Sequence, residues 1–260
     1  MPTENRIAVI TGAAQGIGRQ TALTLAALGY SLALTDVNSC AETCREAAAF
    51  GVQAHEFRGD ITDEAFVTSF ASEVAARYPR VDVLVNNAGI SLICPAESVS
   101  AQQFRRVLEV NLVAPFFLCK AFGQKMLAQR RGSIINVASI AGLAGVADRS
   151  AYNASKHGLI GLTRTLAAEW GGRDVRVNAV CPGWVKTEMD HKDQAAGSYS
   201  DQDIIDRIPM ARFASPEDVA RAIGFLADET QSPFINGHAL TVDGGWTTDA
   251  SWNSLRLQHR

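Results

Sequence analysis

The segment that decides the fold reads RIAVIT at Arg6–Thr11 and GAAQGIG at Gly12–Gly18. The first six residues form a short apolar run typical of a buried parallel strand. Residues 17–28 then follow a helical pattern that Gly29 ends. A strand, a glycine loop and a helix in this order open a dinucleotide-binding unit, because the free N–H groups of the helix attract phosphates. Glycines also occur in ordinary turns, but the position of these glycines between this strand and this helix favours a dinucleotide-binding loop over a bare turn.

The loop glycines have separate tasks. Gly12 permits the tight turn, Gly16 lets the backbone approach a pyrophosphate, and Gly18 allows the helix to pack closely on the strand. The spacing is G-x3-G-x-G rather than G-x-G-x-x-G. The predicted cofactor contacts of this loop are Gly12, Gln15, Gly16, Ile17 and Gly18.

A carboxylate ends the second predicted strand, residues 31–36. Asp36 lies eighteen residues beyond Gly18, where an acid that binds the adenosine ribose is expected. Its charge repels the 2′-phosphate of NADP, and neither Val37 nor Gln15 supplies a compensating cation. The sequence therefore predicts NAD as the cofactor, with a solvated aspartate at a strand end as the alternative.

Three polar residues form a possible proton-transfer group. Tyr152 and Lys156 share one face of a helix predicted over 150–170, and Ser139 precedes them by thirteen residues. A cation ~4 Å from a phenol, at an effective dielectric of ~20, contributes roughly 4 kcal/mol, or ~3 pKa units. This upper estimate brings the phenol near neutral pH, where an acid/base catalyst works best. The alternative is an exposed polar pair on an amphipathic helix.

In this order the residues resemble the short-chain dehydrogenase/reductase family, from Thr11 to Gly245. The further matching residues are Asp60, Asn86-Asn87-Ala88-Gly89, Asn111, Pro182-Gly183 with Thr187, and Gly244-Gly245.

The resemblance implies a mechanism of alcohol–carbonyl interconversion. Ser139 would position and polarise the substrate oxygen, and Tyr152 would take or return its proton. Lys156 would lower the pKa of Tyr152 and hold the nicotinamide ribose, while Asn111 would anchor a water that links Lys156 to solvent. Asp60 would contact the adenine. The further cofactor contacts that the resemblance implies are Ile61, Asn87, Ala88, Gly89, Tyr152, Lys156, Pro182, Gly183, Val185 and Thr187.

Strand and helix patterns alternate along the chain, which predicts a parallel sheet covered on both faces. We expect an α/β, single-domain Rossmann fold over residues 1–260, with a doubly wound seven-stranded parallel sheet. The predicted strands are 6–11, 31–36, 52–57, 81–86, 132–138, 175–181 and 238–242. The predicted helices are 17–28, 40–50, 63–77, 101–128, 150–171 and 216–228.

Composition limits the partners and the compartment. A net charge of −3 indicates neither nucleic-acid nor anionic-membrane binding. No uninterrupted apolar stretch reaches the ~20 residues of a membrane span, and Met1–Arg6 is too short and polar for a signal peptide, so we expect a cytoplasmic protein. Five cysteines and five scattered histidines predict neither a disulfide framework nor a metal site. Cys40 and Cys44 are interpreted as packing thiols rather than a redox pair.

Two regions depart from the alternation. Residues 186–212 are polar and follow the nicotinamide segment, which indicates a substrate lid or, alternatively, a solvated insertion. The tail 246–260 carries Trp246 and Trp252, so we expect it to pack against something. In related tetramers the carboxyl terminus often contacts a neighbouring subunit.

The substrate is less well defined. The candidate pocket residues are Ser91, Arg149, Trp184 and His191. The cations among them would face an anionic or polyhydroxylated molecule, and the indole would stack on a sugar. The alternative is that these residues only pack on the surface or in the lid. The chain resembles NAD-dependent sugar and polyol dehydrogenases. It also resembles 3-oxoacyl-carrier-protein reductases, although these usually prefer NADPH and use a basic patch that is not evident here. A non-catalytic NAD sensor or scaffold is a third interpretation, disfavoured because such proteins typically lose the tyrosine or lysine.

The family resemblance implies a homotetramer formed through the two long helices, 101–128 and 150–171.

Overall fold

The computed structural model describes residues 6–187, 199–252 and 255. The strands are β1 Arg6–Thr11, β2 Tyr30–Asp36, β3 Ala54–Arg58, β4 Val83–Asn86, β5 Gly132–Val137, β6 Val175–Pro182 and β7 Ala239–Val242. They form one parallel sheet in the order β3-β2-β1-β4-β5-β6-β7. The order reverses between β1 and β4, where ligands of doubly wound sheets bind beyond the carboxyl ends of the strands. The predicted fold class is confirmed.

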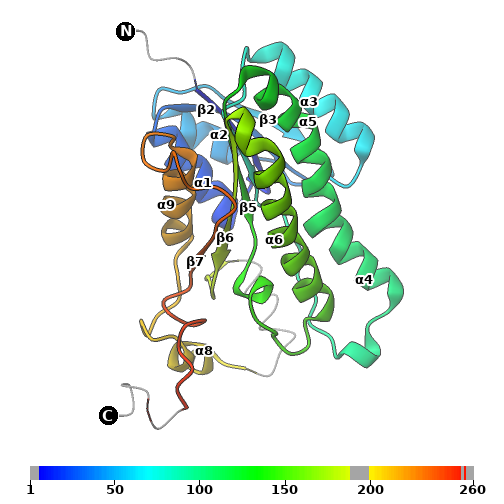
Figure 1. The fold of residues 1–260 in the computed structure, drawn as a ribbon, viewed down its shortest axis with the longest axis vertical. Helices are drawn as coiled ribbons and strands as arrows, with labels where there is room; N and C mark the ends of the chain where they lie inside the picture. The colour runs from blue at the N-terminus through cyan, green and yellow to red at the C-terminus, as the bar shows by residue number, and fades with distance from the viewer. Residues whose placement is uncertain (1–5, 188–198, 253–254, 256–260) are drawn as a thin grey trace.

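Helices cover both faces of this sheet (Figure 1). The α-helices are α1 Gly16–Ala27, α2 Ala41–Ala48, α3 Glu64–Arg77, α4 Ala101–Leu108, α5 Ala114–Gln129, α6 Ser150–Trp170, α8 Asp201–Arg207 and α9 Pro216–Ala227. Short 3-10 turns lie at Ala96–Ser98, Ile140–Gly142 and Gly171–Arg173.

Each face of the sheet has its own hydrophobic core. On one face, α3, α5 and α6 pack on the strands, with the rings of Phe70 and Phe122 edge to face at 5.3 Å. On the other face, α1 and α9 contribute Leu25 and Ile223, both fully buried. The interior strand positions are buried on both faces, which explains why the strands read as continuous apolar runs rather than alternating ones.

The helix predicted over 101–128 is interrupted. A π-helical turn at Glu109–Val113 separates α4 from α5 and contains Asn111. Pro115 follows this turn and has no amide hydrogen for the carbonyl of Asn111, four residues earlier, which favours a local change of hydrogen-bonding pattern. The interruption therefore sets the position of a residue that the sequence analysis assigned to the site.

A short helix, α8, lies within the predicted lid. Ser200 caps it by accepting a hydrogen bond from the backbone N–H of Asp203, whose side chain accepts from the backbone N–H of Ser200. The helices predicted from the sequence include none within residues 186–212, so α8 is an addition to the prediction. Figure 1 places α8 beyond the carboxyl ends of the strands, beside the chain that leaves β7.

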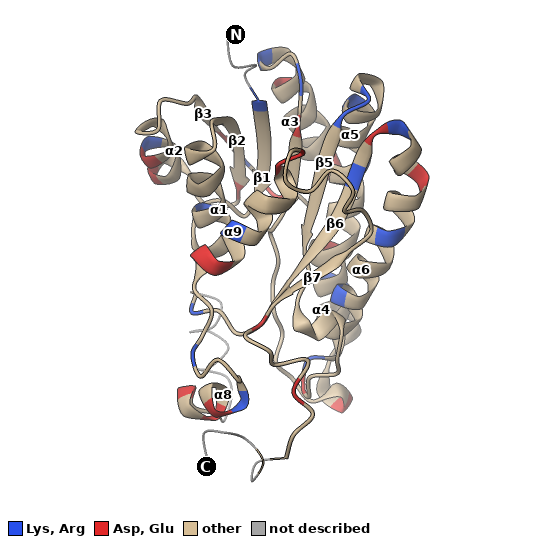
Figure 2. Cartoon of the chain, turned by 60° about the vertical axis from the view of Figure 1, so that its left-hand side comes forward, with Lys and Arg blue, Asp and Glu red and all other residues tan. Residues whose placement is uncertain are grey.

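Charged residues lie mainly on the outer helices and loops, and few of them lie on the strands (Figure 2). Within the described residues, the segment Ala101–Gln129 is long and apolar enough, by length and composition, to cross a membrane. Half of its most apolar window is buried inside the protein, as in a helix that packs on a core.

Candidate active site

A cavity of about 460 Å³ opens at the carboxyl edge of the sheet, beside the point where the strand order reverses. Most of the predicted site residues line it, although they come from distant parts of the sequence. These are Gly12, Gln15, Gly16, Ile17, Asp36, Asp60, Ile61, Asn87, Ala88, Gly89, Ser139, Arg149, Tyr152, Lys156, Pro182, Gly183, Trp184, Val185 and Thr187. Gly18, Asn111 and Ser91 lie outside this lining, and His191 is outside the described residues.

The glycine loop has the geometry that a bound pyrophosphate needs. Gly12 and Gly16 have φ of +66° and +55°, a region that other residues rarely adopt. A Cβ atom at Gly18 would lie 2.0 Å from the carbonyl oxygen of Gly12, so only glycine fits there. The amide of Asn87 donates to the carbonyl oxygens of Thr11 and Gly12, both at 3.0 Å, and holds the loop in place.

The amino-terminal end of α1 opens on the same cavity. Its N-cap residue, Gln15, makes no side-chain capping bond, and the first turn carries no acidic residue. By contrast, Ser215 caps α9 with its hydroxyl group. Helix N–H groups without a side-chain cap are suited to hold an anion, so these residues fit the phosphates of a dinucleotide.

Asp36 lies at the end of β2 and faces the cavity. Its carboxylate accepts hydrogen bonds from the backbone N–H groups of Ala14, at 3.2 Å, and Asn38, at 2.9 Å. These bonds fix the carboxylate between the glycine loop and the chain after β2. The position is compatible with the predicted contact to the adenosine ribose.

Asp60 is held by its neighbours at another side of the cavity. It accepts hydrogen bonds from the backbone and hydroxyl of Thr62, and Arg106 lies 3.2 Å away. Burial raises the pKa of Asp60, but the hydrogen bonds from Thr62 and Arg106 outweigh it and leave the pKa below its usual value. Arg106 also lines the cavity and was missed in the sequence analysis, because an arginine on an amphipathic helix usually marks a solvated face.

Tyr152 and Lys156 project from one face of α6 into the cavity. The Nζ atom of Lys156 lies 5.5 Å from the centroid of the Tyr152 ring and donates a hydrogen bond to the carbonyl oxygen of Val137 at 2.8 Å. The lysine is only 4% exposed, and this burial lowers its pKa to about 8. An ammonium group with that pKa is still mostly protonated at neutral pH, so it can stabilise a neighbouring phenolate.

Ser139 follows β5 and begins the turn Ile140–Gly142. Its hydroxyl oxygen accepts a hydrogen bond from the backbone N–H of Ala141 at 3.1 Å. Since that bond uses a lone pair, the hydroxyl hydrogen is available to a substrate oxygen. Ser139 and Tyr152 both line the cavity, as two groups that bind one oxygen must.

Asn111 connects two parts of the site. Its side-chain oxygen accepts from the backbone N–H of Ile90, and its amide nitrogen donates to the carbonyl oxygen of Ile90 and to the hydroxyl of Ser155. Ser155 in turn donates to the backbone carbonyl of Tyr152 at 2.7 Å. The side chain therefore ties the loop after β4 to α6. Its predicted role in anchoring a water stays a prediction.

Arg149 is the N-cap residue of α6 and is only 7% exposed. Its guanidinium donates to the hydroxyl of Ser91 at 2.9 Å and to that of Tyr199 at 3.2 Å. It also lies 5.4 Å from the centroid of a Trp184 ring. The structure thus brings together three of the four predicted substrate residues.

The lid and the tail, which the sequence analysis treated separately, contact each other. Arg207 of α8 donates to the carbonyl oxygen of Asp249 at 2.8 Å, pairs with its carboxylate at 3.4 Å, and lies 5.0 Å from a Trp246 ring. Trp246 thus packs within the chain, as expected of the tail. Trp252 does not, because it is 69% exposed.

Other candidate chemistries find little support. Across residues 6–187, 199–252 and 255, no group of three or more His, Cys, Asp or Glu side chains gathers to hold a metal ion. Burial raises the pKa of Cys40 to about 12 and that of Cys44 to about 11. Such thiols are poor nucleophiles at neutral pH, in agreement with their interpretation as packing residues.

Known proteins resemble this chain over most of its length. A family profile described as "Enoyl-(Acyl carrier protein) reductase" matches residues 12–247. The chain is 40% identical to D-threitol dehydrogenase from Mycolicibacterium smegmatis over 247 residues, which cover 94% of each chain. It is 36% identical to 3-oxoacyl-[acyl-carrier-protein] reductase from Thermotoga maritima over 247 residues, or 94% of this chain and 99% of that protein.

A solved structure also resembles this chain over most of its length. The crystal structure of a putative NAD(P)-dependent gluconate 5-dehydrogenase from Beutenbergia cavernae, with NADP bound at low occupancy, superposes with a TM-score of 0.86. That protein is 41% identical, and the match covers 94% of this chain and 97% of the other. The chain therefore belongs to the short-chain dehydrogenase/reductase family of oxidoreductases, which use a nicotinamide cofactor.

Proposed function

We propose that this protein interconverts a secondary alcohol and a carbonyl on a sugar or polyol, with NAD(H) as the redox partner. The observation that carries the proposal is the placement of Ser139, Tyr152 and Lys156 in one cavity with the glycine loop. When bound, the nicotinamide supplies hydride transfer to or from the substrate carbon. The chain's own residues hold the substrate oxygen and move its proton.

The proton passes through Tyr152. During oxidation the phenolate oxygen accepts the hydroxyl proton of the substrate, and Ser139 donates a hydrogen bond to the same substrate oxygen. The buried ammonium of Lys156 stabilises the phenolate, since opposite charges attract strongly where water is largely excluded. During reduction the same phenol returns the proton.

NAD is proposed over NADP because of Asp36. Its carboxylate is fixed by backbone donors at the end of β2 and would repel a 2′-phosphate. Arg58 instead favours NADP, since its Nε atom donates to the carbonyl oxygen of Val37 at 2.9 Å and brings a cation near the carboxylate of Asp36. The relative from Beutenbergia cavernae has NADP bound, so the assay must compare both cofactors.

The sugar or polyol assignment is supported by the names of two relatives, one D-threitol dehydrogenase and the other described as a putative gluconate 5-dehydrogenase. Reduction of a 3-oxoacyl-carrier-protein is the alternative enzyme reaction, supported by the relative from Thermotoga maritima. A non-catalytic NAD sensor is the alternative of another class.

The partner that we propose is a second copy of the chain, in a cytoplasmic homotetramer built through α4–α5 and α6. Phe116 of α5 is 42% exposed, and a neighbouring subunit would cover it. Light scattering coupled to size-exclusion chromatography measures the oligomeric state directly.

A substrate panel tests the function. Purified protein is incubated with NAD or NADP and with sugars, polyols and simple secondary alcohols, and formation of the reduced cofactor is followed by absorbance. The reverse assay offers 3-oxoacyl thioesters with NADH or NADPH. Turnover of thioesters alone would replace the proposal with the reductase. Tight NAD binding without turnover of any compound would favour the sensor.

A further inference from the structure

Arg149 occupies an unusual place for an arginine, because its side chain is almost fully buried and lines the active-site cavity. It is the N-cap residue of α6, three residues before Tyr152, and both side chains line the cavity. The preceding residue, Asp148, has φ of +58°, and its carbonyl oxygen accepts from the backbone N–H of Cys94 at 2.8 Å. The start of the catalytic helix is thereby joined to the loop after β4.

The groups around the guanidinium come from three other segments of the chain. Ser91 belongs to the loop after β4, Trp184 follows β6, and Tyr199 lies just before the N-cap residue of α8. The rings of Trp184 and Tyr199 contact each other edge to face, with centroids 5.5 Å apart. Together these residues, which we call the Arg149 cluster, surround one cation with hydroxyl groups and an aromatic face.

This chemistry suits a carboxylate. The planar guanidinium carries five N–H donors in a fork that matches two carboxylate oxygens, and charge-assisted hydrogen bonds are roughly twice as strong as neutral ones. The hydroxyls of Ser91 and Tyr199 can also donate to an anion, and the indole of Trp184 offers an apolar face to a carbon chain. Burial strengthens each of these contacts because little water competes with them.

We propose that Arg149 is a specificity-determining residue that binds the carboxylate of a hydroxy-acid substrate, while Ser139 and Tyr152 hold the hydroxyl that reacts. The substrate class is then a sugar acid, in which a short polyhydroxylated carbon chain separates the two groups. This inference rests on the proposed function and narrows it from neutral polyols to their acids. The carboxylate itself is unchanged in the reaction.

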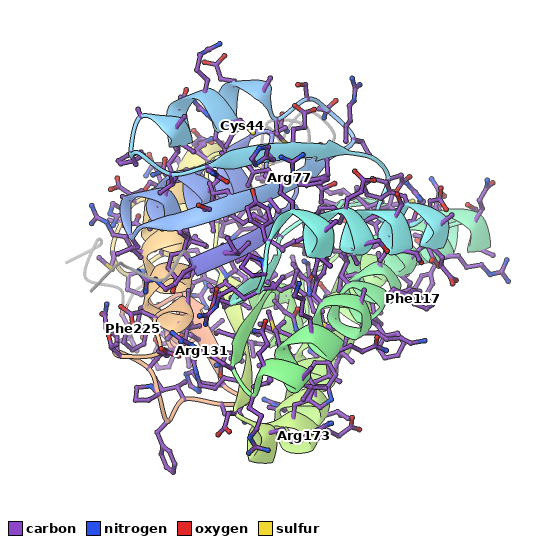
Figure 3. All side chains as sticks on the ribbon, turned by 90° about the horizontal axis from the view of Figure 1, so that it is seen from above. Cys44, Arg77, Phe117, Arg131, Arg173 and Phe225 are labelled. Atoms are coloured by element: carbon purple, nitrogen blue, oxygen red, sulfur yellow. The ribbon has the colours of Figure 1, made fainter. Side chains whose placement is uncertain are left out.

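Matched substrate pairs test the inference. Gluconate and glucitol share one carbon chain and differ in a carboxylate against a hydroxymethyl group, and threonate and threitol differ in the same way. The ratio of kcat/KM for the acid to kcat/KM for the neutral polyol is measured for the wild type, Arg149→Gln and Arg149→Lys. Arg173→Gln is the control, since Arg173 is exposed on the turn after α6 and projects from the edge of the molecule (Figure 3).

The wild type is expected to favour the acid. Arg149→Gln should lower the acid-to-polyol ratio by about 10- to 100-fold, the effect of losing one charged hydrogen-bonding partner. Arg149→Lys keeps the charge but lacks the two-pronged guanidinium, so its acid-to-polyol ratio should lie between those of the wild type and Arg149→Gln. The ratio for Arg173→Gln should match that of the wild type. Equal use of acid and polyol by the wild type would overturn the inference and leave the proposed function standing. A parallel loss with both substrates in Arg149→Gln would also overturn it, because it would indicate only a structural role.

A binding measurement separates failure of the inference from failure of the proposed function. Titration calorimetry of gluconate into the NADH complex is run for the wild type and Arg149→Gln. If neither acid nor polyol is oxidised, the proposed function fails. In that event, gluconate binding that depends on Arg149 would still support the carboxylate site, and binding that is absent or unaffected by the substitution would overturn it.

Discussion

The ammonium group of Lys156 lies 5.5 Å from the centroid of the Tyr152 ring, while it donates its hydrogen bond to the carbonyl oxygen of Val137 rather than to a carboxylate. The charge next to the phenol is therefore held by a neutral group. A carboxylate partner would cancel much of the field at the phenol, whereas a peptide carbonyl leaves most of it. Burial destabilises the charged form of Lys156 and lowers its pKa to about 8.

Removing the phenolic hydroxyl should remove the proton transfer. We expect Tyr152→Phe to lower kcat by at least ~100-fold, the lower end of what general acid/base catalysis contributes. Binding of NADH, followed by its fluorescence, should persist. Tyr30→Phe is the control, because that hydroxyl lies at the start of β2 and contacts the carbonyl oxygen of Ala227. Full activity in Tyr152→Phe would refute the assigned role.

The lowered pKa of Lys156 predicts a pH-dependent stability. Between pH 8 and 10.5 the unfolded chain holds a proton on this lysine that the folded protein releases, so stability rises with pH in that window. Below pH 8 both states are protonated, and the folded protein bears the full penalty of the buried charge. The free energy of unfolding of the wild type, relative to Lys156→Met, should therefore increase by about 2 kcal/mol from pH 7.5 to pH 9.5.

Urea denaturation of the cofactor-free protein at the two pH values measures this difference. Lys156→Met also leaves the carbonyl oxygen of Val137 without its donor, but that loss does not depend on pH. A constant difference between the two proteins would show that the lysine is not desolvated.

Asp36 should control the choice of cofactor. We expect Asp36→Ala to reduce the ratio of kcat/KM for NAD to that for NADP by roughly 10- to 100-fold, equivalent to about 1.4–3 kcal/mol. The carboxylate both binds ribose hydroxyls and repels the 2′-phosphate, and alanine does neither. Asp174→Ala, at an exposed site on the turn before β6, is the control. An unchanged ratio would remove Asp36 from the cofactor assignment.

Asn111 should matter for stability as well as for activity. Asn111→Ala removes three hydrogen bonds and leaves the backbone N–H and carbonyl of Ile90 without their side-chain partner. We expect the free energy of unfolding to fall by about 2–3 kcal/mol, as for buried polar groups that lose a partner. Asn38→Ala, on the surface, should change it by less than about 0.5 kcal/mol. Urea denaturation of both variants at neutral pH gives the comparison.

The contact between lid and tail predicts an effect on substrate affinity from a residue outside the cavity. Asp249→Ala removes the carboxylate that pairs with Arg207, so α8 should dock less firmly beside Tyr199 and the Arg149 cluster. We expect KM for the substrate to rise several-fold while KM for NAD stays within about twofold, because the cofactor contacts lie on the strand ends. Truncation after Gly245 should have a larger effect in the same direction. A truncated enzyme that kept the oligomeric state and the full activity of the complete chain would contradict any role of the tail.

The fold was predictable because its signals are local and repeated. Strands buried on both faces appear as short apolar runs, as in β1 and β5, and a glycine or polar residue follows each of these two runs, Gly12 after β1 and Ser139 after β5. The candidate catalytic residues were predicted from the spacing of Tyr152 and Lys156 on one helix together with the family resemblance. By contrast, α8 is seven residues long and polar, so its capping box at Ser200 was its only signal.

Partners of the site residues were harder to predict. Arg149 meets Ser91 and Tyr199, which lie 58 and 50 residues away in sequence. Arg106 reaches Asp60 across 46 residues from a helix face that reads as solvated. Such contacts depend on how loops from different strands converge at the carboxyl edge of the sheet, and no local pattern encodes that convergence. The π-helical turn at Asn111 likewise depends on Pro115, whose effect on a long helix is to end, kink or rewind it.

The salt bridge between Arg207 and Asp249 also bears on how the protein should be handled in the laboratory. A carboxyl-terminal affinity tag would extend the segment that holds α8 through Asp249, and we expect it to weaken that contact. A tag placed ahead of β1 joins the opposite edge of the sheet, far from the strand ends that form the cavity. Kinetic constants for sugar acids and polyols should therefore be compared between amino-terminally tagged and tag-free enzyme, and purification handles at the other end avoided.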